Sequence, residues 1–171
     1  TFYGQEGEFP RKTIIDGVAY LGLDSMAEEL NWHDAIFSEG ELGAKQLKRL
    51  DKTLKSSEVK KCKKRVVYLH HHPFQWRPFR QLKDAAKLEK TLVSIIKQGI
   101  SIDALLYGHN HQGHAHNGQW GIARCYDAGT VTLKPRPKYL KKISWFQIRS
   151  ATRVIHIRHK DTRHDYELPL L

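Results

Sequence analysis

Long apolar runs are missing from this chain. No stretch of its 171 residues approaches the length of a membrane-spanning helix, which needs about 18 uninterrupted apolar residues or more. Repeats, low-complexity tracts and linkers are missing as well, so we expect residues 1–171 to form a single domain. No signal peptide is visible, but the chain opens on Thr1 rather than on Met, so that absence decides little.

Cysteine is scarce. The two cysteines, Cys62 and Cys125, lie far apart and do not have the close spacing of a zinc-binding pair. We therefore expect packed thiols without a chemical role. This sparse use of cysteine fits a reducing compartment, and a cytoplasmic location is the expectation.

Acidic residues are few compared with basic ones, 18 against 29, which gives a net charge of +11. Such an excess attracts polyanions, so phosphorylated substrates, anionic lipid and nucleic acid are all candidate partners. The basic residues concentrate at 45–65 and 134–142. A solvated basic surface is the favoured explanation of these runs, because runs of charge usually only keep a surface hydrated. Aromatic residues are not interleaved in them as single-strand binding requires.

Apolar runs and helical stripes alternate along the chain. Four short apolar runs predict β-strands at residues 18–23, 65–69, 102–107 and 121–126. Two further β segments are predicted at 143–148 and 152–157, and their alternation favours antiparallel pairing near Ser150.

Two helices are predicted between these strands. Ser38 and Glu41 have the spacing of a capping box, so the first helix should follow them and end near Ser56, with a stripe of leucines on one face. Asp84 is placed to cap the second helix, and Gly99 to end it. Strand, helix and strand then follow one another between residues 65 and 107, which predicts a parallel pair and an α/β fold.

Histidines follow two of the predicted strands at the point where each strand ends. His70, His71 and His72 follow the strand at 65–69, and His109 and His111 follow the strand at 102–107. Ligands gather at the carboxyl ends of parallel strands, and neutral imidazole is the commonest metal ligand of proteins. The sequence therefore predicts a metal site that includes His71, His109 and His111.

The order of these motifs resembles a known family. Five segments, taken in order, resemble the second half of calcineurin-like metallophosphoesterases, especially the bacterial class III cyclic-nucleotide phosphodiesterases. The segments are a strand followed by LGLDS, then GELGAKQLKRLDKTL, RVVYLHHHP, LLYGHNH and YDAGT. The resemblance covers residues 18–130. It implies a β-sandwich flanked by helices, and a hydrolase that cleaves phosphodiesters or phosphomonoesters with a hydroxide bound at a two-metal site.

The resemblance also implies roles for individual residues. His71, His109 and His111 would hold two divalent ions of Mn, Fe or Zn, with His70 as the alternative to His71 because the triple run leaves the register open. The side chains expected near the substrate phosphate, for each of which a solvated loop is the competing interpretation, are His72, His114, Arg77 and Arg80.

Three motifs of the family are missing from the chain: Asp-x-His, Gly-Asp-x-x-Asp and Gly-Asn-His. The carboxylate that bridges the two metals in the family belongs to the second of these. We therefore expect the carboxyl-terminal part of a metallophosphoesterase domain that lacks its amino-terminal half and is inactive alone, or a truncated relative that has lost the reaction.

Two other functions compete with this interpretation. An inactive module could bind nucleic acid or a partner protein through its basic surface, with an affinity that falls steeply with salt. A mononuclear zinc site is the other alternative, because three histidines and a water form a known catalytic zinc pattern.

Overall fold

The structure is a computed structural model that describes residues 9–26, 39–74, 81–110, 115–127, 148–149 and 152–153. Four of the residues predicted to take part in the site therefore lie outside the described residues: Arg77, Arg80, His111 and His114.

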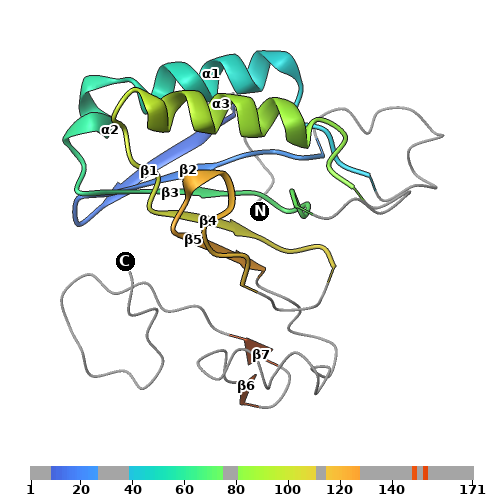
Figure 1. Cartoon of the computed structure of the whole chain (residues 1–171). Coiled ribbons are helices and arrows are strands. Elements are labelled where there is room, and N and C mark those ends of the chain that lie inside the picture. The colour runs from blue at the N-terminus through green and yellow to red at the C-terminus, as the bar shows by residue number, and fades with distance from the viewer. Residues whose placement is uncertain are drawn as a thin grey trace.

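A mixed five-stranded sheet forms the centre of the fold, with the strand order β1-β2-β3-β4-β5 (Figure 1). β1 pairs antiparallel with β2, and the remaining neighbours pair in parallel. The strands are β1 (Arg11–Ile15), β2 (Val18–Gly22), β3 (Lys64–Tyr68), β4 (Ala104–Tyr107) and β5 (Arg124–Asp127). The predicted α/β class is confirmed, and four of these strands overlap the predicted runs.

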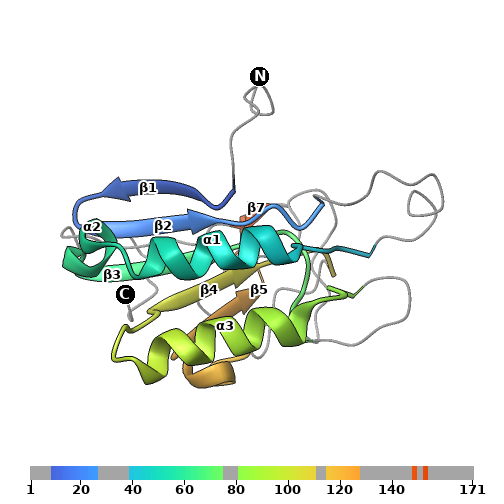
Figure 2. The same cartoon turned by 90° about the horizontal axis from the view of Figure 1, so that it is seen from above.

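Three helices cover one face of this sheet: α1 (Ala44–Leu54), α2 (Ser57–Lys61) and α3 (Ala85–Lys97). Figure 2 shows α1 and α3 lying side by side over the sheet, roughly along the direction of the strands. α1 buries its predicted leucine stripe against the sheet, and α3 buries Leu88, Leu92 and Ile95. Full burial of such a side chain contributes about 1.5–3 kcal/mol, so the helical layer supplies much of the core.

The hairpin that joins β1 to β2 was not predicted. Its two-residue turn consists of Asp16 and Gly17, whose φ angles are 50° and 79°. Positive φ at both central positions is typical of a type I′ turn, which an Asp-Gly pair favours. The pair was therefore a usable sequence signal for an antiparallel strand at the edge of the sheet.

The start of α1 differs from the prediction. The helix begins at Ala44 after Gly43, and the carboxylate of Asp84 accepts the N–H groups of Leu42 and Gly43, each at 3.0 Å. The predicted capping box at Ser38 and Glu41 is therefore not what begins this helix. Asp84 does precede α3, but its side chain makes no capping bond to α3 and bridges to α1 instead.

The sheet face opposite the helices is apolar in part. Val18, Val66 and Ala104 form a small buried cluster there. The strand register places Ile15 and Tyr68 on the same face, and these side chains are 51% and 42% exposed. The two-stranded antiparallel sheet of β6 (Ile148–Arg149) and β7 (Thr152–Arg153) matches the predicted pairing near Ser150.

Among the residues that the structure describes, no helix combines the length and the apolar character needed to cross a membrane.

Replacing Asp84 tests the bridge between α1 and α3. Asp84→Ala leaves two buried N–H groups without an acceptor, so we expect a loss of about 2–4 kcal/mol in the free energy of unfolding, measured with urea. Asp84→Asn keeps one acceptor oxygen and should lose less.

Asp51→Ala is the matched control on α1. Asp51 forms a half-exposed i,i+4 ion pair with Lys55, so its removal should cost about 0.5 kcal/mol or less. Equal losses for Asp84→Ala and Asp51→Ala would contradict the role given to Asp84.

Candidate metal centre

The two histidine loops are joined by their backbones at the carboxyl ends of β3 and β4. The N–H of Leu69 donates to the carbonyl of Leu106 at 3.0 Å, and the N–H of Gly108 donates to the carbonyl of His70 at 3.0 Å. Parallel pairing thus continues past the last residue of each strand. The loops that follow the two strands are therefore held side by side.

Three imidazoles converge at this point. His70, His71 and His109 each offer a ring nitrogen, and these nitrogens lie within 4.8 Å of one another. Nε2 of His70 and Nδ1 of His109 are 3.1 Å apart. Of the described residues, these three form the only group of histidine, cysteine and acidic side chains close enough to hold an ion, and no carboxylate belongs to it.

The prediction for two of the three ligands fits this arrangement, since the structure brings His71 and His109 together. His70, the alternative to His71, joins them rather than replacing His71. The ligand role of these residues stays a prediction, as does that of His111, which lies outside the described residues.

His109 has an unusual backbone conformation. Its φ is 71°, and the N–H of Asn110 donates to the carbonyl of Gly108 at 2.9 Å, which closes a three-residue γ-turn around His109. A γ-turn with positive φ at its centre is rare and strained. In any residue other than glycine, the Cβ atom comes too close to the backbone in this conformation, which raises its energy. Strain of this kind is concentrated at functional sites.

His71 is enclosed by other parts of the chain. The residue is 1% exposed, and its Nδ1 lies 2.8 Å from the hydroxyl of Ser25, three residues after the end of β2. The backbone N–H of His71 also donates to this hydroxyl, at 3.3 Å. The backbone of Gly40 packs against the face of the ring, where a Cβ atom would come within 2.2 Å of Nδ1 and 2.4 Å of Cγ.

His72 does not belong to the group of three histidines and lies in an aromatic cluster. The residue is 1% exposed, its Nδ1 accepts the N–H of Phe74 at 3.1 Å, and its ring lies 4.5 Å from that of Tyr107. The other rings of the cluster are those of Phe74, His116 and Trp120. In this position His72 packs the two loops together, and its predicted contact with substrate stays untested.

Two titratable side chains in and beside this aromatic cluster, Tyr107 and Cys125, are held in their neutral form. Burial raises the pKa of the Cys125 thiol to about 12. Burial also raises the pKa of Tyr107, and the nearby Cys125 and Asp127 raise it further. Both side chains are therefore protonated near neutral pH, which excludes Cys125 as a thiolate ligand or nucleophile in this state. Both cysteines are buried and reduced, as predicted.

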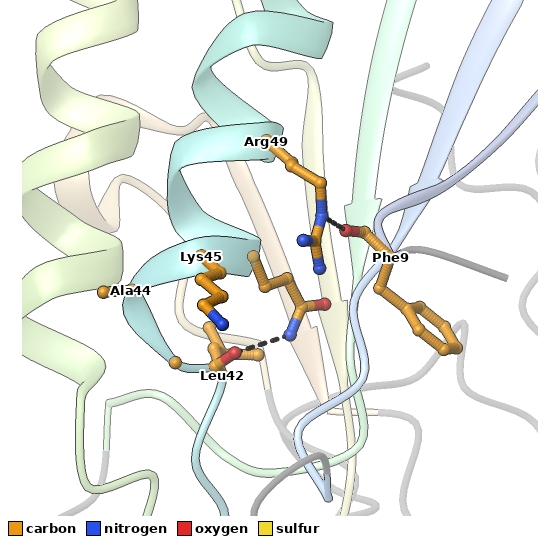
Figure 3. A pocket seen from close by; sticks show the side chains of 7 residues that line it. Phe9, Leu42, Ala44, Lys45 and Arg49 are labelled. Atoms are coloured by element: carbon orange, nitrogen blue, oxygen red, sulfur yellow. Dashed lines mark hydrogen bonds between the residues drawn. The ribbon is translucent and has the colours of Figure 1, made fainter. Parts of the chain in front are cut away.

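A separate pocket of about 400 Å³ lies at the start of α1 (Figure 3). Phe9, Lys45 and Arg49 are among its lining residues, and the guanidinium of Arg49 donates to the carbonyl of Phe9. A helix start beside two basic residues could attract an anion. Here the carboxylate of Asp84 already accepts the N–H groups of Leu42 and Gly43, so we assign no ligand to this pocket.

No protein-family profile matches the chain, and no curated protein matches it.

The strain at His109 can be measured in the absence of metal. We expect His109→Gly to be more stable than His109→Ala by about 1 kcal/mol, because glycine adopts a positive φ without the steric cost that alanine pays. Urea unfolding in the presence of a chelator gives both values.

The same pair of substitutions at Lys90, an exposed position on α3, serves as control. There alanine should be the more stable residue by about 1 kcal/mol, because glycine is unfavourable inside a helix. The same order at both positions would contradict a strained His109.

Thiol labelling tests the neutral interior. Cys125 is fully buried and its pKa is raised to about 12, so at pH values well below 12 it carries a proton and should resist alkylation in the native chain. Mass spectrometry after iodoacetamide treatment at mildly alkaline pH reads out the label, and unfolding in urea should make Cys125 reactive. Rapid native labelling of Cys125 would show that this interior is open.

Proposed function

We propose that this chain supplies part of the active site of a metal-dependent phosphoesterase. The convergence of His70, His71 and His109 at the carboxyl ends of two parallel strands carries the proposal. The resemblance of the sequence motifs to metallophosphoesterases supports it independently of the geometry.

The donors suit a transition metal. Imidazole nitrogen suits Zn and Fe, whereas Mg, Ca and Mn prefer oxygen ligands, so Mn would depend on the carboxylates of a complete site. His71 and His109 would act as ligands together with His70, and His111 would add a further one. When bound, the metal would act as a Lewis acid on a phosphoryl oxygen and lower the pKa of a water molecule.

The surroundings of the three histidines suit an anionic substrate. The three imidazoles are uncharged donors, and no carboxylate of the described residues joins them, so they would leave the positive charge of an ion uncompensated. The net charge of +11 adds a favourable field for phosphate. His70 is exposed while His71 is buried, so a substrate would approach from the side of His70.

The missing carboxylates set the limits of this proposal. A two-metal site of the metallophosphoesterase type, within a β-sandwich, needs carboxylate ligands from the amino-terminal half of such a domain. We propose that these ligands complete the site in the active protein. The mononuclear zinc site is the second candidate, because three imidazoles without a carboxylate match its ligand set.

The competing binding module has one observation in its favour. α1 turns Lys45, Lys48 and Lys52 to solvent on the face opposite its buried leucines. A basic helix surface of this kind could follow a phosphate backbone, and such binding would need no metal.

Metal titration separates these functions. We expect the 171-residue chain to bind Zn²⁺ in calorimetry, and the variants His70→Ala, His71→Ala and His109→Ala each to weaken binding at least about tenfold, since each loses one ligand. His164→Ala, at a histidine outside both motifs, is the matched control and should bind as the unmodified chain does.

The number of ions bound then distinguishes the two kinds of metal site. One tightly held Zn²⁺ favours the mononuclear site, and weak binding that still depends on the three histidines favours the incomplete two-metal site. No binding, or equal binding by all variants, would contradict the metal centre and favour the binding module.

Hydrolysis tests the reaction itself. The full-length product of the gene should hydrolyse bis(p-nitrophenyl) phosphate in the presence of Mn²⁺, and His109→Ala should abolish that activity. Full activity of His109→Ala would overturn the assignment.

A further inference from the structure

His71 is the most enclosed of the three histidines, and its surroundings determine which ring nitrogen can bind a metal. A neutral imidazole carries its proton on one nitrogen and presents a lone pair on the other. With 1% exposure, the residue has almost no contact with solvent, so its protein partners decide the tautomer. The Ser25 hydroxyl lies beside Nδ1, and the backbone of Gly40 packs against the ring.

The Ser25 hydroxyl closes the Nδ1 edge of the ring, and the backbone of Gly40 packs against the ring face. The Ser25 hydroxyl lies 2.8 Å from Nδ1, and the backbone at Gly40 lies so close that a Cβ atom there would be 2.2 Å from Nδ1 and 2.4 Å from Cγ. With the Ser25 hydroxyl 2.8 Å from Nδ1, no ion fits at this nitrogen. Nε2 is therefore the atom that His71 can turn toward His70 and His109.

The chain holds both groups firmly in place. Ser25, itself 1% exposed, accepts the N–H of Glu41 on its carbonyl at 2.9 Å. The preceding residue, Asp24, exchanges two hydrogen bonds of 2.8 Å with the side-chain amide of Gln46, which lies on α1. Ser25 is thus fixed on both sides, by α1 and by the segment that contains Gly40.

Two backbone hydrogen bonds hold Gly40 against residues 81–83, which precede α3. Its N–H donates to the carbonyl of Gln81 at 2.9 Å, and its carbonyl accepts the N–H of Lys83 at 2.8 Å. These two bonds leave Gly40 little room to move away from the ring. A side chain at this position would have to displace His71 instead.

We propose that Ser25 and Gly40 are positioning residues for the metal centre. The Ser25 hydroxyl accepts the Nδ1–H of His71 and so keeps the lone pair on Nε2. Gly40 provides the space in which the ring takes up that orientation. The opposite arrangement, in which the hydroxyl donates to Nδ1, would place the proton on Nε2 and block the metal.

This inference rests on the metal centre proposed above, but its first test needs no metal. Long-range ¹H–¹⁵N correlation spectra of the labelled, metal-free chain report which nitrogen of His71 carries the proton. We expect Nδ1–H in the unmodified chain. A predominantly Nε2–H form would overturn the inference, whatever the metal affinity proves to be.

Zn²⁺ titration provides the second test. Ser25→Ala should weaken binding about 10- to 100-fold, which is the usual cost of losing a group that orients a ligand histidine. Ser25→Thr retains the hydroxyl and should recover part of the loss. Ser94→Ala, an exposed serine on α3, is the matched control and should bind as the unmodified chain does.

Gly40→Ala tests the steric part of the inference. The added methyl group should displace the His71 ring, lower the Zn²⁺ affinity and shift the His71 resonances, while circular dichroism shows the fold retained. Unchanged affinity in Ser25→Ala or Gly40→Ala, with the unmodified chain binding Zn²⁺, would overturn this inference alone. A chain that binds no Zn²⁺ would overturn both the inference and the metal centre.

Discussion

The candidate site depends on the parallel pairing of β3 with β4. This pairing extends beyond both strands through the bonds from Leu69 to Leu106 and from Gly108 to His70. Because the strands run in the same direction, their carboxyl ends meet at one edge of the sheet, and each delivers its histidines there. An antiparallel arrangement of the same two strands would place the histidines at opposite edges. The crossover helix α3 makes the parallel arrangement feasible, and its buried residues fasten it to the sheet.

The three histidines that follow β3 occupy three different environments, and this division explains how one short run serves several purposes. His70 is exposed, His71 is enclosed by Ser25 and Gly40, and His72 packs against Tyr107 in the aromatic cluster. The buried ring of His72 packs against Tyr107 and so holds the loop that carries His70 and His71 against β4. A rigid base is what a metal site requires, since ligand geometry must be set before the ion arrives.

The sequence was informative where a structural signal is local. Apolar runs located β2, β3 and β4, the stripe of Leu88, Leu92 and Ile95 located α3, and the histidines at two strand ends indicated where a metal site would form. The sequence was less informative about contacts between distant segments. Asp84 has the position of a helix cap, and only the folded chain shows that its carboxylate reaches α1. The closeness of Gly40 to His71 depends on segments 31 residues apart in number, and no local pattern reveals it. The position of His70 relative to His109 likewise depends on how the loop turns after β3.

The central claim is that His70, His71 and His109 form a metal centre at the carboxyl ends of β3 and β4. An anomalous difference map from crystals of the chain soaked in Zn²⁺ tests this claim most directly. The account predicts zinc among these three imidazoles, about 2.0–2.1 Å from the nitrogens that bind it, with Nε2 as the donor atom of His71. A map with no peak among these histidines, or with zinc bound only elsewhere on the chain, would contradict it.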